Sequence, residues 1–289
     1  MPIRTILCPT AYGPLAEPAL RHAAFLAERH DAALHVLHVL EDGNPSARAL
    51  EMARDHLSSF LQSFEIEAVE AVLASQDVAP AIADYADRHA VDLVVMGTHG
   101  RSGVRRLLLG SVAEALFRIA PCPLVALRER GTAFPRGPLD GVLVPLDLSE
   151  HSRRVLPLAK EFAAAYGATL HVLHVVADLN VPFYGAVESP LAEAFPEIRV
   201  RARSEMERAL AAAPGPDVPT EVHFAHGDAT DTIVEWAEAH GVDLIALTRT
   251  GWRGVTGLLV GSVANGIVRG APCPILVVPV LEDEERDLA

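Results

Sequence analysis

The sequence repeats itself over most of its length. The segment LHVLHV occurs at 34–39 and again at 170–175, and APCPLV at 120–125 returns as APCPIL at 271–276. The first pair is 136 residues apart and the second 151, so the second copy carries 15 additional residues, which must follow Val175. A repeat this long is a whole domain, because solenoid units recur every ~20–50 residues. We therefore predict two domains, 1–130 and 141–281, with a linker at 131–140 and an acidic tail at 282–289.

Short Val/Ile/Leu runs alternate with longer segments of helical period in each copy. In the first copy the runs predict strands near 5–9, 33–40, 66–73, 93–96 and 124–127. The segments between them predict helices near 16–29, 47–63, 80–89 and 112–119. This order implies a parallel sheet with helices on both faces, because right-handed crossovers place them there. The predicted fold class is α/β, with two doubly wound domains.

The charge and apolar pattern exclude two classes of partner. A formal net charge of -14 argues against binding to nucleic acid or to an anionic membrane, which would repel the chain at long range. No apolar run reaches the ~18 residues of a membrane span, and an apolar strand begins after four residues, so we expect a cytoplasmic protein.

Cys8, Cys122 and Cys273 form no C-x-x-C pair and are expected to be small buried hydrophobes.

A glycine-rich segment follows the expected strand at 93–96. Gly97 and Gly100 lack a Cβ, so their backbone amides can approach an anion closely or adopt a positive φ. Gly110 and Ser111 then open a helix, whose free amides and positive dipole end favour a phosphate. In open α/β sheets, ligands bind beyond the carboxyl ends of the strands. The segment is therefore a candidate phosphate-binding loop.

Simpler interpretations of the same residues stay open. Ser111 and Glu114 match the S-x-x-E capping box, in which the serine caps its own helix. Arg101, Arg105 and Arg106 supply local positive charge, yet each is equally typical of a solvated surface.

The complete pattern G-x2-G-x9-G-S is echoed in the second copy by Gly251, Gly261 and Ser262. In this pattern the chain resembles a universal stress protein of the tandem, two-domain form, over nearly all of its length. The resemblance implies a five-stranded parallel sheet in each domain. It also implies that ATP, with or without magnesium, binds between the first-strand loop and the glycine loop. The implied nucleotide-binding residues are Gly97, Gly100, Arg101, Gly110, Ser111, Val39, Asp147, Val175, Gly251, Gly261 and Ser262.

Each copy departs from the family pattern at one position. An aspartate usually follows the first strand and contacts the nucleoside; the second copy has Asp147 there, but the first has Ala11. The position of Gly97 is occupied by Thr248 in the second copy, and a β-branched residue tolerates positive φ poorly. We therefore expect unequal sites, with the first copy more readily occupied. Val39 and Val175, whose backbone would contact adenine by resemblance, are also typical core residues.

Other candidate chemistry is absent from the sequence. His35 and His38 alternate onto opposite strand faces, as do His171 and His174, so neither pair can chelate one metal ion. No nucleophile elbow, P-loop or dinucleotide fingerprint occurs, and no catalytic base is identified.

Three functions compete. The first is an ATP-binding regulatory protein of the stress response, and the second a nucleotide-free protein that acts through partner binding. The third is a slow ATPase. The apolar segments PLVAL and PILVVPV are typical of sheet-edge strands. By resemblance they pair across the two copies in an intramolecular pseudo-dimer, and a homodimer is an open alternative.

Overall fold

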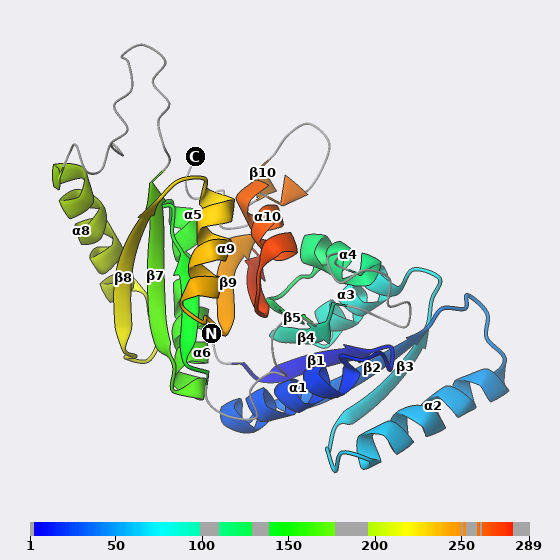
Figure 1. Ribbon diagram of the computed structural model, residues 1–289. Coiled ribbons are helices and arrows are strands. Elements are labelled where there is room, and N and C mark those ends of the chain that lie inside the picture. The colour runs from blue at the N-terminus through cyan, green and yellow to red at the C-terminus, as the bar shows by residue number, and fades with distance from the viewer. Residues whose placement is uncertain are drawn as a thin grey trace. The chain divides into compact units, whose positions relative to one another are not determined.

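The computed structural model describes residues 3–98, 110–128, 139–176, 196–249, 251–252, 259–260 and 262–279 (Figure 1). The chain divides into two compact units: unit 1 is Met1–Arg136 with Pro274–Ala289, and unit 2 is Gly137–Cys273. Most of the expected linker, the insertion after Val175 and the acidic tail lie outside the described residues. Both units are α/β with mainly parallel strands, which confirms the predicted fold class.

Unit 1 alternates strands and helices as the sequence predicts. Its strand order is β3-β2-β1-β4-β5-β12, and the first five strands run parallel. Its strands are β1 (Thr5–Thr10), β2 (Ala33–Leu40), β3 (Val69–Ala74), β4 (Leu93–Gly97), β5 (Leu124–Leu127) and β12 (Ile275–Pro279). Its helices are α1 (Ala16–His30), α2 (Ala47–Gln62), α3 (Val78–Arg88) and α4 (Ser111–Ile119).

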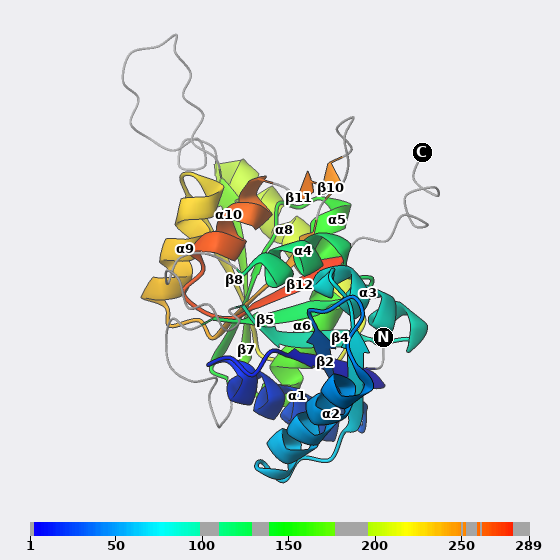
Figure 2. The ribbon, with the colours of Figure 1, turned by 90° about the vertical axis from the view of Figure 1, so that its right-hand side faces the viewer.

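The helices of unit 1 cover both faces of its sheet. The chain moves outward from β1 to β2 and β3, and then returns past β1 to β4 and β5. Because the crossovers are right-handed, this reversal places α1 and α2 on one face and α3 and α4 on the other, as Figure 2 shows. The central strands between these layers are largely buried, with Ile6 of β1, Leu37 of β2 and Leu93 of β4 at 0% exposure.

Strand β12 is the antiparallel member of the sheet in unit 1. Ile275, Leu276 and Val277 lie opposite Ala126, Val125 and Leu124 of β5. By the sequence repeat β12 is the fifth strand of the second copy, yet it is part of the compact unit that contains the first. The pairing covers the edge that β5 would otherwise expose.

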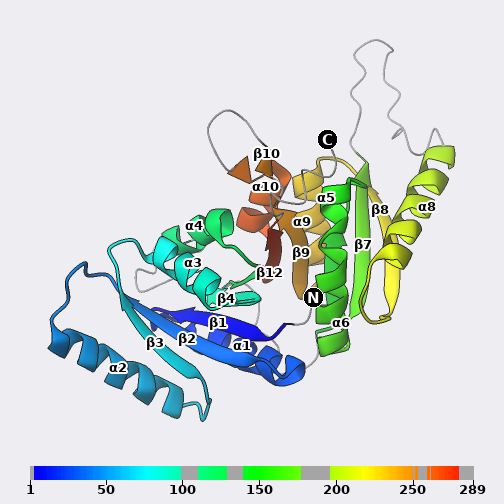
Figure 3. The same ribbon diagram turned by 180° about the vertical axis from the view of Figure 1, so that it is seen from behind.

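Unit 2 repeats the architecture, with the parallel order β9-β6-β7-β8. Figure 1 shows α9 in front of these strands, and Figure 3, from behind, shows α6 in front of them. The strands are β6 (Gly141–Pro145), β7 (Thr169–Val176), β8 (Thr220–His226) and β9 (Leu244–Arg249), with short strands β10 (Gly251–Trp252) and β11 (Leu259–Val260). The helices are α5 (Glu150–Arg153), α6 (Leu156–Tyr166), α8 (Pro196–Ala212), α9 (Ala229–Ala239) and α10 (Ser262–Gly270).

The first helix of unit 2 is divided where that of unit 1 is continuous. Helix α1 runs unbroken over 15 residues, whereas the matching stretch of unit 2 is split into α5 and α6. Pro157 stands in the first turn of α6, at the position of Arg21 in the first copy. Proline has no N–H to donate and its ring clashes with the preceding turn, so a helix restarts there.

An aspartate fastens the first strand in each unit. In unit 1, Oδ2 of Asp92 accepts from the backbone amides of Arg4 at 2.7 Å and Thr5 at 3.0 Å. In unit 2, Oδ2 of Asp243 accepts from those of Asp140 at 2.7 Å and Gly141 at 3.1 Å. A carboxylate that takes two amides forms charge-assisted bonds, which are stronger than neutral ones. The VDL motif of both copies thus sets where β1 and β6 begin.

The cysteines are free and buried, as the sequence predicts. Burial raises the pKa of the Cys8 thiol to about 12, so it stays protonated and unreactive. Among the described residues, no helix is long and apolar enough to span a bilayer.

Candidate functional site

The candidate site of unit 1 begins where β1 and β4 separate. The two strands pair only at Ile6 with Leu93 and at Leu7 with Val94, although both continue for three more residues. The crossovers on the two sides of this point run over opposite faces of the sheet. Ligands of doubly wound proteins bind at this type of position.

The turn after the first strand has the same unusual backbone in both units. Tyr12 has φ 57° and Leu148, at the matching position, has φ 67°. A left-handed conformation costs a residue with a Cβ roughly 1–2 kcal/mol. The turns are shaped by different side chains: Oγ1 of Thr10 accepts from the amide of Tyr12, and Oδ1 of Asp147 accepts from the amide of Ser149. The first copy thus keeps the turn without the aspartate.

A histidine of the second strand fixes the end of the first. Nδ1 of His38 lies 2.9 Å from the carbonyl oxygen of Thr10, and Nδ1 of His174 lies 2.7 Å from that of Leu146. Because a carbonyl only accepts, Nδ1 is the protonated nitrogen of each ring. His35 instead contacts the hydroxyl of Tyr85 on α3, which confirms that His35 and His38 face opposite sides.

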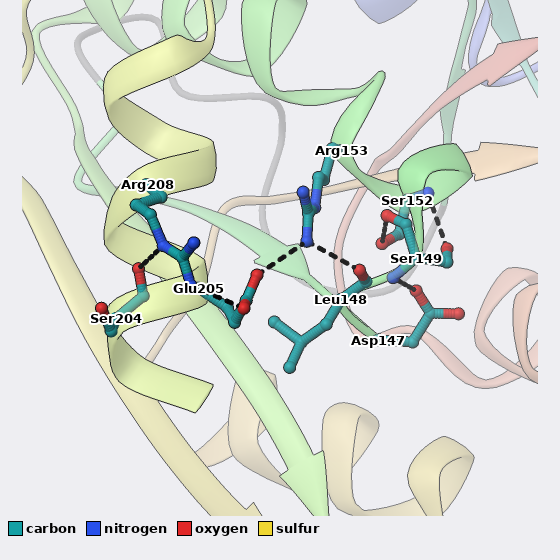
Figure 4. A network of polar contacts seen from close by, with 8 residues as sticks. All are labelled: Asp147, Leu148, Ser149, Ser152, Arg153, Ser204, Glu205 and Arg208. Atoms are coloured by element: carbon teal, nitrogen blue, oxygen red, sulfur yellow. Dashed lines mark hydrogen bonds and ion pairs between the residues drawn. The ribbon is translucent and has the colours of Figure 1, made fainter. Parts of the chain in front are cut away.

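Asp147 is exposed and belongs to the polar network of Figure 4. Burial acts to raise the pKa of its carboxyl, but hydrogen bonds from Ser149 and Ser152 outweigh it and lower the pKa below the ordinary value. In the same network Arg153 donates to the carbonyl of Leu148 at 3.0 Å. Asp147 is therefore an ionised acceptor held at the end of β6.

Gly97 serves packing, which sequence reasoning did not foresee. It has no positive φ. A Cβ at this position would lie 2.5 Å from Cβ of Leu15, which is buried in the connection between β1 and α1. Leu15 therefore fills the space beside Gly97, and the glycine lets that connection cross the end of β4.

We expect the substitution Gly97→Ala to lower the free energy of unfolding by about 1–3 kcal/mol, as overpacking of a core does. The contact atom is the Cβ of Leu15, so the backbone of the connection must move. Thermal unfolding followed by far-UV circular dichroism measures the effect. An alanine variant as stable as the wild type would show that Leu15 does not require a glycine there.

Helix α4 begins at Ser111, directly after Gly110. Gly110 is its first flanking residue, with φ -62° and ψ 148°, and its amide donates to the carbonyl of Thr98 at 2.7 Å. Within the described part of the chain no side chain caps the helix, so the capping-box interpretation of Ser111 is wrong. The amides of the first turn, beginning with Ser111, have no intrahelical acceptor. Ser111 is exposed.

The matching segment of unit 2 is described in part. Gly251 lies in β10 and pairs with Val260 of β11. Thr248, at the position of Gly97, is buried with 7% exposure. Burial lowers the pKa of the Arg249 guanidinium, which ends β9. Ser262 is the exposed first residue of α10.

The remaining expected site residues are of two kinds. Val39 is buried with 8% exposure near the end of β2, and Val175 is half-buried near the end of β7, so both lie at carboxyl ends of strands. Gly100, Arg101 and Gly261 lie outside the described residues.

Sequence reasoning missed a polar cluster on the sheet of unit 2. His171, Glu221 and His223 bring one ligand atom each to within 4.8 Å of one another. Burial lowers the pKa of His171 and of His223, although the charge of Glu221 opposes the shift at both rings. The alternation in EVHFAH signals that Glu221 and His223 share a face, but only the strand register places them beside His171.

The fold and site geometry define a tandem doubly wound α/β protein, with a helix terminus that no described side chain caps at the switch point of unit 1. The model of the Universal stress protein family matches residues 2–128 and 139–279, so the chain belongs to this family. The sequence resemblance is thereby confirmed.

Related proteins agree with this assignment. A universal stress protein of Mycobacterium tuberculosis (strain ATCC 25618 / H37Rv) is 31% identical over 189 residues, which are 64% of this chain and 61% of that protein. One of Mycolicibacterium smegmatis is 26% identical over 284 residues, with 91% and 92% covered. The solved structure of a putative universal stress protein from Pseudomonas aeruginosa UCBPP-PA14 has a TM-score of 0.69 at 20% identity, covering 96% of this chain and 93% of that one. This structural likeness establishes the fold.

Proposed function

We propose that the chain is a cytoplasmic ATP-binding regulatory protein of the stress response, with two unequal nucleotide sites. The observation that carries the proposal is the amino terminus of α4, which no described side chain caps and which directly follows the glycine-rich segment. Unpaired amides and the positive end of a helix dipole bind phosphate groups. ATP, alone or with magnesium, would place its phosphates there and its adenine near the backbone of Val39.

The inequality of the sites is inferred from what each unit lacks. Unit 1 has Ala11 where unit 2 has the ionised Asp147, so unit 1 lacks an acceptor for the nucleoside hydroxyls. Unit 2 has the buried, β-branched Thr248 where unit 1 has Gly97, and its Gly251 lies in β10 and pairs with Val260 of β11. The phosphate groups carry the negative charge of ATP. We therefore expect the unit with the more favourable phosphate end, unit 1, to bind ATP more tightly.

The pairing of β5 with β12 supports a second part of the proposal, that the two copies form an intramolecular pseudo-dimer. Each copy contributes its final strand to this pair. A regulatory role requires that ATP change the arrangement or the surface of the protein, and strands shared in this way would couple the copies.

The substitution Ser111→Asp is expected to affect ATP binding and folding stability in opposite directions. The new carboxylate repels phosphate at α4, and we expect ATP affinity to fall at least ~10-fold, or about 1.4 kcal/mol. The same carboxylate stabilises a helix amino terminus by about 0.3–1 kcal/mol, so thermal stability should be unchanged or higher. Calorimetric titration of the intact chain with ATP measures the affinity.

The matched control is Ser262→Asp, which makes the same change at α10 of unit 2 and should weaken the tighter site little. Tight ATP binding that survives Ser111→Asp would remove the assignment to unit 1. A wild-type chain that binds no ATP would favour the partner-binding alternative. Linear release of phosphate over many turnovers would favour the ATPase.

A further inference from the structure

The cluster of His171, Glu221 and His223 lies on one face of the unit 2 sheet. His171 of β7 is opposite Glu221 of β8, and Leu173 is opposite His223. Residues two apart on a strand point to the same face, so Glu221 and His223 both flank the ring of His171. The cluster lies in the first half of β7, away from the carboxyl ends where the nucleotide is proposed to bind.

The three ligand atoms form a nearly regular triangle. Nδ1 of His171 lies 3.2 Å from Nε2 of His223 and 3.6 Å from Oε2 of Glu221, and the last two atoms are 3.5 Å apart. Ligands bound tetrahedrally to Zn²⁺ at 2.0–2.2 Å are separated from each other by ~3.3–3.6 Å. We propose that these three side chains form a binding site for one divalent transition-metal ion, with Zn²⁺ as its representative. Two imidazoles and a carboxylate suit such ions better than they suit Mg²⁺ or Ca²⁺.

Aromatic packing holds the histidine rings in place. The ring of Trp236, on α9, is centred 5.6 Å from that of His171 and 4.8 Å from that of His223. The ring of His240 in turn stacks on that of Trp236, with the two ring centres 3.9 Å apart. Metal sites require ligands whose orientation is fixed by their surroundings.

The site is accessible to an ion from solution. The side chains of His171 and His223 are 18% and 27% exposed, and that of Glu221 is 61% exposed. Three protein ligands leave the fourth tetrahedral position for a water molecule. In the metal-free protein, one imidazole donates a hydrogen bond to the other, and the ion would replace that proton.

The first copy lacks this arrangement. The residues of β3 that match Glu221 and His223 in register are Val69 and Ala71, opposite His35 and Leu37. Nδ1 of His35 is instead 2.9 Å from the hydroxyl of Tyr85. The metal site is therefore a feature of unit 2 alone, and His35 provides a matched position for a control.

Binding would join two neighbouring strands. β8 is the outer strand of the order β9-β6-β7-β8, and the site takes one ligand from β7 and two from β8. An ion bound only by the folded state stabilises it by mass action. The ion would thus stabilise unit 2 without any contact with the nucleotide.

Titration of the metal-free intact chain with ZnCl₂ tests the proposal. We expect one saturable site per chain. His223→Gln should weaken zinc binding at least ~100-fold and Glu221→Gln at least ~10-fold, because loss of a residue that only hydrogen-bonds a metal ligand already lowers metal affinity ~10–100-fold. His35→Gln should bind as the wild type does. Both tryptophans, Trp236 and Trp252, lie in unit 2, so their fluorescence reports its unfolding. With zinc at 100 times the wild-type Kd, the unfolding equilibrium constant should fall ~100-fold in the wild type and in His35→Gln, but at most ~10-fold in Glu221→Gln and ~2-fold in His223→Gln.

The proposal is overturned if the wild type has no saturable zinc site, or if both variants bind zinc as tightly as it does. Because Glu221 is mostly exposed, Glu221→Gln is expected to fold, and circular dichroism of the zinc-free variants checks this. ATP binding does not enter the experiment, so its result is independent of the proposed nucleotide function.

Discussion

Replacing Lys160 with methionine is expected to lower the free energy of unfolding of unit 2 by about 2–4 kcal/mol, because it removes two hydrogen bonds from a charged donor, which contribute about 1.5–3 kcal/mol each, and regains part of this as desolvation energy. Lys160 is the only lysine in the chain and is 9% exposed. Its Nζ donates to the carbonyl oxygens of Leu210 at 2.9 Å and Ala213 at 2.8 Å, at the carboxyl end of α8. Methionine keeps the length and apolar stem of the side chain, so the decrease in the free energy of unfolding reports the contribution of the ammonium group.

The sign of this effect depends on which of two terms is larger. Burying an ammonium group costs desolvation energy, which methionine would not pay. Against that, Lys160 satisfies two carbonyls at the negative end of the α8 dipole, where a cation is favoured. Both donor distances are short, so we expect the hydrogen bonds to outweigh the desolvation.

Urea unfolding followed by tryptophan fluorescence measures the change, because both tryptophans belong to unit 2. The control is Lys160→Arg, which keeps the charge but replaces a compact group with a planar fork, and should lose less than methionine does. A methionine variant as stable as the wild type would mean that desolvation dominates at this position.

The sequence predicted the buried parallel strands well, because strands covered on both faces are continuous apolar runs. β2 spans 33–40 and β5 spans 124–127, as expected from the sequence. β3 was less well predicted: it starts at Val69 instead of 66, after a turn in which Glu65 has φ 56°. It is an edge strand with several exposed residues, so its apolar signal is weak.

Long-range partners were not predictable from local patterns. The sequence marks Lys160 as unusual, but its acceptors come 50 and 53 residues later. The glycine at 97 was expected to serve a ligand, whereas the structure gives it a contact with Leu15, 82 positions earlier in the chain. The pairing of β12 with β5 and the cluster around His171 likewise depend on register between distant segments.

Acidification below pH 6.5 is expected to destabilise unit 1 through His22, by about 1.4 kcal/mol per pH unit. His22 lies on the buried face of α1 at 4% exposure, and burial lowers its pKa from 6.5 to about 3. Between these values the unfolded chain binds a proton that the folded chain does not. Stability is therefore fully present above pH 6.5 and is lost as the pH falls toward 3, in total about 5 kcal/mol.

Comparison with His22→Gln isolates this residue from the other titrating groups. Carboxylates contribute mainly below pH 5, so the diagnostic window is pH 6.5 to 5, in which His22 accounts for about 2 kcal/mol. Denaturant unfolding across this window, followed by far-UV circular dichroism, should give a steeper pH dependence for the wild type than for the variant. Equal slopes would mean that the ring of His22 is protonated in the folded protein, and hence that the interior around α1 admits charge.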